Sequence, residues 1–297
     1  WDVFRRVTFR QAGRITYEEL AAQLQEQDQV LCVVNSRKSA QEIFLRLEGV
    51  GCFHLSTLMY PAHRRAQLEE IRRRLDKRLP CRVVSTSLIE AGVDVDFPAV
   101  YREEAGLDSI LQAAGRCNRE GKRPLENSIV TVFQGEGNTP PLFATAIGAG
   151  REAMARYEDI TSPEAVHTYF SNLLDLKGTE AQDAQHILPL MQSELFPFRT
   201  VSERFHLIDS PTVTIYIPKE EGAELIERLR SGERSRDLYR RLGQYGVSVY
   251  EQHFNTLDQA GDLERLEDGS VILSNLDLYS EDTGLSLKAD SGKGLFI

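Results

Sequence analysis

The sequence predicts an α/β protein, in which a parallel sheet flanked by helices is followed by a helical connector and a small α+β domain. Three observations support this fold class. Short apolar runs alternate with helical patterns up to residue 136, which is typical of βαβ units in a parallel sheet. The run at 30–34 is apolar at every position, as in a strand covered on both faces. A Gly- and Pro-rich stretch at 135–141 separates this part from the rest.

The first elements follow from local signals. Residues 1–15 alternate in polarity as a strand does. Thr16 and Glu19 have the spacing of a capping box, which predicts that a helix begins at this point. The strand at 30–34 comes next, and Ser36, directly after it, can cap a second helix.

Further strands and helices complete the predicted sheet. Pro61 is a favoured first residue for a long basic helix that extends to residue 78. Apolar residues at helical spacing predict another helix at 107–119. The remaining strands are predicted at 51–55, 81–86, 99–102 and 128–133.

The second half of the chain has a different pattern. The connector, residues 137–195, carries three helical segments, at 142–158, from a capped start at 161–164, and at 180–192. From residue 196 the elements are short, with strands predicted at 205–208, 212–217, 247–249 and 271–273, and helices at 220–230 and 234–242. The predicted domains are therefore 1–136, 137–195 and 196–297.

The composition is that of a globular protein with an uneven charge. A length of 297 residues with 41% hydrophobic residues fits about two domains with buried cores. Residues 1–150 hold 20 Lys and Arg against 19 Asp and Glu, whereas residues 151–297 hold 15 against 26. The net charge of −10 does not exclude nucleic acid, because a binding groove needs only local positive charge.

Other classes of protein are not favoured. No apolar run is long enough to cross a bilayer and the N-terminus does not resemble a signal peptide, so we expect a cytoplasmic protein. The chain opens abruptly and without Met, which indicates a piece of a longer chain. The four cysteines form no C-x-x-C pair and predict free buried thiols, and with scattered histidines they predict no metal site. The acidic residues at 277–282 lack the spacing of an EF-hand.

The stretch 82–96 points to phosphate chemistry. A strand runs into the small hydroxyl residues Ser85, Thr86 and Ser87, and Gly92 then lets the backbone turn toward Asp94. In parallel α/β sheets, nucleotide contacts lie at the carboxyl ends of strands. Further strands end near Asn35, Ser36 and Ser56. Hydroxyl groups at one sheet edge can bind successive phosphates of single-stranded nucleic acid. Each such residue alone is more often a cap or turn residue.

The tip of the predicted helix at 107–119 points to a transferring phosphoryl group. Arg116 and Arg119 are three residues apart and would share one helix face, where both guanidinium groups could be aimed at one anion. Gln112, one turn earlier, has an amide that could position a water or hold an arginine. The alternative is a solvated helix end, the usual meaning of two arginines. The basic residues of the predicted helix at 61–78, of which Arg64 is the first, could likewise form either a nucleic-acid face or a plain solvated surface.

Two segments resemble the motifs of a known superfamily. Residues 85–94 resemble motif V of superfamily 2 helicases, and Gln-x-x-Gly-Arg-x-x-Arg at 112–119 resembles motif VI. Within that superfamily, the Cys-Asn between the two arginines, the segment 54–65 and the tail at 276–285 resemble the CRISPR-associated helicase–nuclease of type I interference systems.

This resemblance implies a fold and a set of roles. Residues 1–136 would be the second RecA-like lobe, followed by the connector and an accessory domain that closes over the DNA path. Arg116 and Arg119 would reach the γ-phosphate of ATP held by the other lobe, near Gly92, Asp94 and Gly115. The residues implied in binding single-stranded DNA are Asn35, Ser36, His54, Ser56, Arg64, Thr86 and Ser87.

The resemblance also implies partners that the chain lacks. They are single-stranded DNA, a first lobe and a nuclease domain of the same protein, and a crRNA surveillance complex. The sequence has no G-x-x-x-x-G-K-[ST] loop and no Asp-Glu-x-His/Asp strand end, so ATP and Mg²⁺ would be held mainly by the first lobe. We therefore expect the chain alone to be inactive. Two alternatives remain, a lobe of another superfamily 2 helicase and an adaptor without catalytic activity.

Overall fold

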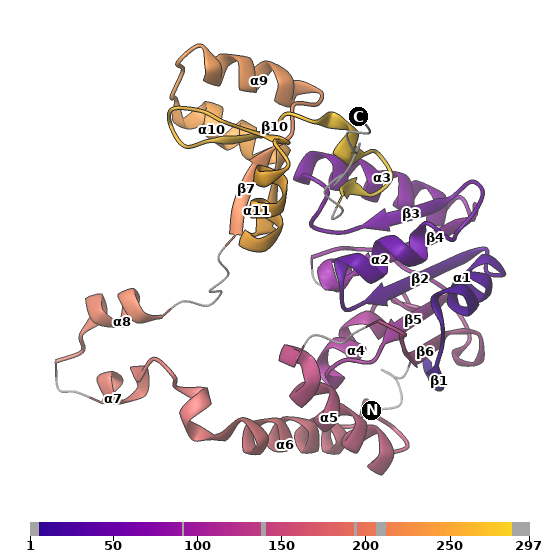
Figure 1. Cartoon of the computed structure of the whole chain (residues 1–297). Coiled ribbons are helices and arrows are strands. Elements are labelled where there is room, and N and C mark those ends of the chain that lie inside the picture. The colour runs from indigo at the N-terminus through magenta and orange to yellow at the C-terminus, as the bar shows by residue number, and fades with distance from the viewer. Residues whose placement is uncertain (1–5, 91, 138–140, 193–194, 206–211, 287–297) are drawn as a thin grey trace, which may run out of the picture. The chain divides into compact units, whose positions relative to one another are not determined.

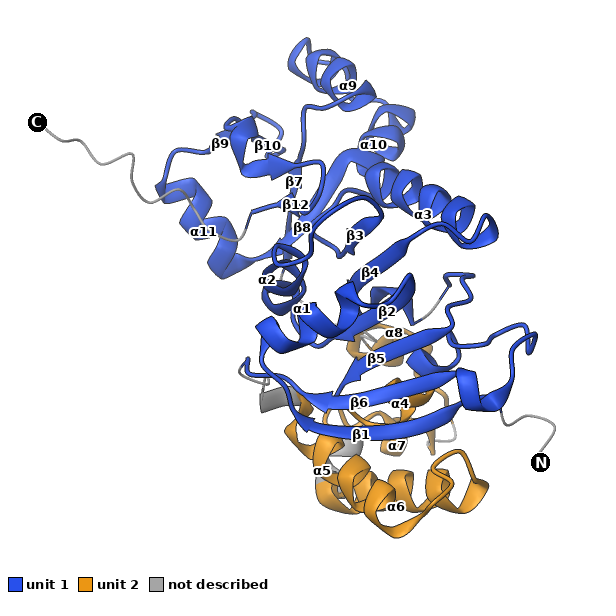
Figure 2. Cartoon of the chain, turned by 90° about the vertical axis from the view of Figure 1, so that its right-hand side faces the viewer, with its two compact units in different colours: residues 1–103, 112–138, 211–297 blue, residues 104–111, 139–210 orange. Residues whose placement is uncertain are grey.

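The computed structural model describes residues 6–90, 92–137, 141–192, 195–205 and 212–286 (Figure 1). The chain divides into two compact units (Figure 2). Unit 1 contains residues 1–103, 112–138 and 211–297, and unit 2 contains residues 104–111 and 139–210. Residues of the predicted C-terminal domain from 211 onward therefore group with the strand-rich part of the chain and not with the connector.

A six-stranded sheet in the order β1-β6-β5-β2-β4-β3 forms the centre of unit 1. Every neighbouring pair is parallel, which confirms the predicted α/β sheet. The strands are β1 (Thr8–Arg14), β2 (Gln29–Val34), β3 (Cys52–Leu55), β4 (Cys81–Thr86), β5 (Ala99–Glu103) and β6 (Ile129–Gln134). Each lies close to the apolar run that predicted it.

Helices cover both faces of this sheet. On one face, α1 (Tyr17–Gln25) and α2 (Arg37–Phe44) pack over the side chains of Val30, Cys32 and Val34. On the other face, α3 (Pro61–Asp76) and the end of α4 (Leu107–Ala114) pack over Leu31 and Val33. Since successive side chains of a strand point to opposite faces, a fully apolar β2 requires helices on both sides.

Local signals explain where two helices begin. Thr16 forms the predicted capping box, because its hydroxyl accepts from Glu19 N (3.2 Å) while Glu19 Oε2 accepts from Thr16 N (2.9 Å). Ser36 caps α2 with a single bond, because its hydroxyl accepts from Ser39 N at 2.9 Å. Both caps were predicted from residue type and spacing alone.

A second, mixed sheet in the order β8-β7-β10-β9 lies in the C-terminal part of unit 1. Its strands are β7 (Thr212–Tyr216), β8 (Gly246–Tyr250), β9 (Leu263–Arg265) and β10 (Val271–Leu273). Helices α9 (Glu221–Arg230), α10 (Arg236–Leu242) and α11 (Glu251–Gln259) accompany it. α9, α10, β7, β8 and β10 were predicted, whereas α11 and β9 were not.

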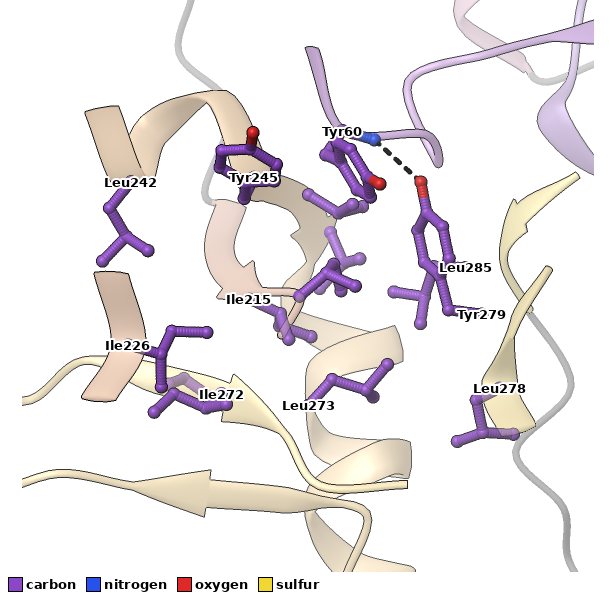
Figure 3. Packing of buried hydrophobic residues seen from close by; sticks show 14 of the residues in the cluster. Tyr60, Ile215, Ile226, Leu242, Tyr245, Ile272, Leu273, Leu278, Tyr279 and Leu285 are labelled. Atoms are coloured by element: carbon purple, nitrogen blue, oxygen red, sulfur yellow. Dashed lines mark hydrogen bonds between the residues drawn. The ribbon is translucent and has the colours of Figure 1, made fainter. Parts of the chain in front are cut away.

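The end of the described chain forms a tail that packs against the large sheet's half of unit 1. The tail contains the short hairpin β11 (Tyr279–Ser280) and β12 (Gly284–Leu285). Leu58 and Tyr60 belong to the same buried cluster as Tyr279 and Leu285 (Figure 3). Leu285 N donates to Leu58 O at 2.8 Å. Gly284 has φ of +74°, and a Cβ there would lie 2.4 Å from Leu58 O, so only glycine fits this approach.

Unit 2 is helical and differs from the prediction in its second half. It contains α5 (Pro141–Arg156), α6 (Pro163–Gln182), α7 (Ile187–Met191) and α8 (Phe198–Arg204). Tyr169 Oη donates to Asp108 Oδ1 at 2.6 Å within this unit. The predicted helix at 180–192 is divided between the end of α6 and α7, and α8 lies where short strands were expected to begin. Most of the predicted strand at 205–208 lies outside the described residues.

No helix among the described residues is long and apolar enough to cross a membrane.

All four cysteines are free thiols, as predicted. Cys32, Cys81 and Cys117 are buried, and Cys52 is half-buried. Burial raises the pKa of the Cys81 and Cys117 thiols to about 12, so neither is a reactive thiolate at neutral pH.

Candidate nucleotide and nucleic-acid site

The chain leaves β4 through a tight turn that returns toward the start of β5. Ser85 is fully buried and its hydroxyl donates to Leu55 O at 3.1 Å. A short 3₁₀ turn, Ser87–Ile89, stands where a helix-forming segment was expected. Gly92 has φ of +71°, the left-handed conformation that glycine adopts at no steric cost. This turn brings Asp94 to the surface, where its side chain is 81% exposed.

α4 ends earlier than predicted. The helix expected to reach residue 119 ends at Ala114 and is followed by turns. Phe97 N donates to Arg116 O (2.9 Å) and Asn118 N donates to Phe97 O (3.0 Å), so this segment pairs with another part of the chain instead of extending the helix. Asn118 also has φ of +46°, which an α-helix does not contain. The prediction that Arg116 and Arg119 share one helix face is therefore wrong.

The two arginines have different environments. Arg116 is 7% exposed, and its Nε and Nη2 donate to the backbone oxygens of Ile89 (3.0 Å) and Glu90 (2.5 Å). Nη1 of Arg116 makes no hydrogen bond to a described residue. Arg119 is 42% exposed and forms an ion pair with Asp94, Nε to Oδ1 at 2.7 Å. Arg119 is therefore accessible from solvent, whereas the Arg116 side chain is turned inward.

Charges around Arg116 lie close together. Burial lowers the pKa of Arg116, the nearby positive charge of Arg119 lowers it further, and Asp94 and Glu90 oppose this shift. The guanidinium remains charged at any physiological pH, because its ordinary pKa is above 12. The turn after β4 and the turn after α4 thus place two cations and two carboxylates within electrostatic reach of one another.

Residues that the sequence analysis missed hold the turn after α4. Asp96 Oδ1 accepts from Arg119 N at 2.7 Å, and its Oδ2 pairs with Arg123 Nη1 at 2.8 Å. Asn118 is 2% exposed, and its side chain donates to Arg6 O (2.9 Å) and Arg123 O (2.8 Å). The Asn of the Cys-Asn pair is thus structural. Its position between two motif arginines was visible in the sequence, but its partners were not.

A second missed group is a buried ion pair beneath the sheet edge. Arg102, on β5, is 2% exposed, and its Nε lies 3.0 Å from Glu90 Oε1. Arg102 Nη1 also donates to Asn35 Oδ1 at 2.8 Å. Glu103, the next residue, is 5% exposed and accepts from Asn35 N through Oε2 at 2.7 Å. Asn35, expected to bind DNA, is therefore engaged in an internal network.

The predicted hydroxyl residues differ in their accessibility. Ser36 is the cap of α2, and the fully buried Ser56 accepts from Leu58 N at 3.2 Å within a turn. Thr86 is 9% exposed, whereas Ser87 is exposed. In this conformation the Ser56 hydroxyl is not accessible to DNA, because the turn that follows β3 closes over it.

His54 and Arg64 also face inward in part. His54 is 1% exposed, packs near the ring of Phe44 (5.9 Å between centroids), and neither ring nitrogen has a partner among the described residues. The expectation of a DNA contact from this side chain does not agree with its burial. Arg64 is half-buried, and its Nη1 donates to Met59 O at 2.6 Å.

Burial of His54 predicts a dependence of stability on pH. Burial, and to a lesser extent the charge of His63, lower the pKa of His54 to about 4. An unfolded histidine titrates near 6.5, so the native state binds fewer protons between these values, and the contribution of His54 to stability is full above pH 6.5 and is lost as pH falls toward 4. Between pH 7.5 and 5 we expect the free energy of unfolding to fall by about 2 kcal/mol through this group.

The measurement is urea unfolding at both pH values for the chain and for His54→Phe. The variant should lose less stability on acidification than the parent, by about that amount. An equal loss in the two proteins would show that His54 does not titrate in this range.

The remaining predicted residues lie at the surface. Gln112 lies on α4 and Gly115 directly follows it, and both are exposed.

An exposed Arg119 beside a buried Arg116 can bind an anion such as a phosphate through charge-assisted hydrogen bonds. The residues described here include no group of three or more His, Cys, Asp or Glu side chains that could hold a metal ion.

Comparison with known proteins identifies relatives of this site. Residues 26–122, which contain both turns, match the family described as CRISPR-associated nuclease/helicase Cas3, C-terminal. Two curated proteins named CRISPR-associated nuclease/helicase Cas3 are similar in sequence. The one from Haloferax volcanii is 45% identical over 65 residues, and the one from Methanothermobacter thermautotrophicus is 29% identical over 134 residues. These matches cover 22% and 43% of this chain and only 7% and 16% of the relatives.

Solved structures share the fold. The structure of T. fusca Cas3 with AMPPNP has a TM-score of 0.59 at 14% identity, covering 94% of this chain and 42% of that chain. The structure titled T. fusca Cas3-ATP gives 0.57 at 14% identity, covering 90% and 39%. A structure titled CRISPR RNA-guided surveillance complex, pre-nicking, gives 0.53 at 15% identity, covering 95% and 43%. The chain thus spans about two fifths of these proteins.

Proposed function

We propose that the chain is the second RecA-like lobe and accessory domain of an ATP-dependent DNA translocase, because residues 26–122 match the family described as CRISPR-associated nuclease/helicase Cas3, C-terminal. ATP would be held between this lobe and a first lobe that supplies the P-loop and Mg²⁺. The nuclease would be a further domain of the same protein, and a crRNA surveillance complex would deliver the DNA.

The observation that carries this proposal is the pair of unlike arginines. Arg119 is an exposed guanidinium that pairs with Asp94, and Asp94 is itself 81% exposed, so an incoming phosphate can displace that carboxylate at little cost. Arg116 keeps Nη1 without a hydrogen bond to a described residue, while its other groups are fixed to backbone oxygens. A fixed donor beside an adjustable donor suits the charge that spreads over a transferring γ-phosphoryl group.

The DNA path is proposed along the carboxyl ends of β2, β3 and β4. Ser87 is exposed at the end of β4 and Thr86 is next to it, so these two residues can meet a phosphate through hydroxyl and backbone N–H groups. The other residues predicted for this edge would support its conformation without contacting DNA, since their polar groups are buried or already hydrogen-bonded. They are Asn35, Ser36, His54, Ser56 and Arg64.

The test is ATP turnover with and without single-stranded DNA. We expect DNA-dependent hydrolysis by a protein in which this chain is joined to a P-loop lobe. We expect none by the chain alone, because its sequence contains no P-loop. With Ser87→Asp, half-maximal stimulation should need about tenfold more DNA, because the new carboxylate repels phosphate. Ser231→Asp, an exposed position at the end of α9, is the matched control.

An adaptor without catalytic activity is the competing hypothesis. It predicts that the longer protein binds DNA but that ATP turnover is absent or independent of DNA. That outcome would contradict the proposed translocase and leave the fold assignment unchanged.

A further inference from the structure

We propose that Arg102 is a positioning residue that, through its buried ion pair with Glu90, fixes the turn whose backbone holds Arg116. The inference rests on the proposed function, because it assigns the device that keeps one of the two phosphate-binding arginines in place. Neither Arg102 nor Glu90 belongs to the set of residues that the sequence predicted for the site.

Three layers of contact lead from β5 to Arg116. Arg102 is anchored on β5, a central strand paired on both sides, by β2 and β6. Its Nε lies 3.0 Å from Glu90 Oε1, and both side chains are at most 7% exposed. The backbone oxygens of Glu90 and its neighbour Ile89 then accept the two hydrogen bonds from Arg116 at 2.5 and 3.0 Å.

The turn needs such an anchor because it has little regular structure of its own. Ser87–Ile89 is a single 3₁₀ turn, and Gly92 follows with a positive φ. Ile89 contributes apolar burial, but apolar contacts do not fix the direction of a carbonyl group. The ion pair with Arg102 ties the Glu90 side chain to a central strand, and so restrains the backbone of Glu90 and the two oxygens that receive Arg116.

The burial of the pair argues for a role other than stability. Burial lowers the pKa of Arg102, and the negative charges of Glu90 and Glu103 oppose that shift. Buried ion pairs are often no more stabilising than apolar residues of similar volume, because both charges must be desolvated. A pair retained at this cost directly beneath Arg116 and the β4 turn is suited to geometric specificity.

The same turn leads back to the proposed DNA edge. Only Leu88 separates Thr86 and Ser87 from Ile89 and Glu90, the two residues whose oxygens hold Arg116. If Thr86 and Ser87 shift when they bind a phosphate, the backbone of residues 88–90 would carry that shift to Arg116. Arg102 would hold the Glu90 side chain in place during this movement.

The experiment compares Arg102→Met, Glu90→Gln and the double variant in the protein that joins this chain to a P-loop lobe. Each variant is made twice, once with Arg116 intact and once combined with Arg116→Ala. We expect Arg102→Met to lower kcat for ATP by about tenfold to hundredfold with little change in KM, and to have almost no further effect when Arg116 is already absent. The double variant should regain stability but not kcat. Arg82→Met is the matched control, since Arg82 is a half-buried arginine on β4 that bonds Gln25 O.

A second readout does not depend on catalysis. In the isolated chain, the Nε–H resonance of Arg116 should be protected from exchange, and Arg102→Met should remove that protection while Arg82→Met should not. Independent losses from Arg102→Met and Arg116→Ala, or an unchanged Arg116 resonance in Arg102→Met, would overturn the inference. A longer protein without any ATP turnover would contradict the proposed function instead, and the resonance would still decide the inference.

Discussion

Arg119→Ala is expected to lower ATP turnover by about a thousandfold or more in the protein that joins this chain to a P-loop lobe, because removing an arginine that stabilises the transferring phosphoryl group has effects of that size. Binding of single-stranded DNA should be mostly retained. The Arg119 side chain is 42% exposed, so its removal should not unfold the chain. The measurement is steady-state ATP hydrolysis at saturating DNA, with DNA affinity measured separately.

The matched control is Arg241→Ala. Arg241 is 44% exposed and forms an ion pair with Glu221, so it resembles Arg119 in exposure and in having a carboxylate partner, but it lies on α10. Turnover in this variant should stay within about twofold of the parent, because an exposed ion pair contributes little. If Arg119→Ala were as active as Arg241→Ala, Arg119 would not be the phosphate-binding group.

The parallel sheet could be predicted because its signals are local. The apolar residues at 30–34 require cover on both faces wherever the strand lies, and Thr16 and Ser36 cap the helices that follow them through contacts only three residues away. α11 and β9 were missed because they are short and polar along much of their length, and packing in unit 1 stabilises them.

The site could be predicted only in outline. The sequence placed Arg116, Arg119 and Asp94 in one site, and the structure brings these three together. It could not show that Arg116 turns inward, because the oxygens that accept its hydrogen bonds are 26 and 27 residues away in the sequence. The burial of His54 and the pairing of Arg102 with Glu90 are likewise long-range contacts without a local pattern.

Tyr279→Ala is expected to have the largest effect on stability among the tail residues, lowering the free energy of unfolding by about 4 kcal/mol. Tyr279 is 4% exposed and stacks on Tyr60, with ring centroids 5.2 Å apart (Figure 3). Its hydroxyl accepts from Tyr60 N (3.2 Å) and lies 2.8 Å from His63 Nδ1, so both a buried ring and two polar contacts would be lost. Tyr279→Phe, which keeps the ring, should cost about 1–2 kcal/mol.

The outcome separates two ways in which the C-terminal domain could be held on the large sheet's half of unit 1. Tyr250 also joins these parts, since the Arg37 guanidinium lies 4.7 Å from its ring centroid, but Tyr250 is 51% exposed. Tyr250→Ala should therefore cost no more than about 1 kcal/mol in urea unfolding of the chain. If the tail fixes the domain through its buried contacts, Tyr279→Ala must exceed this by several-fold. Equal costs in the two variants would mean that the exposed contacts hold the parts together and that the tail is dispensable.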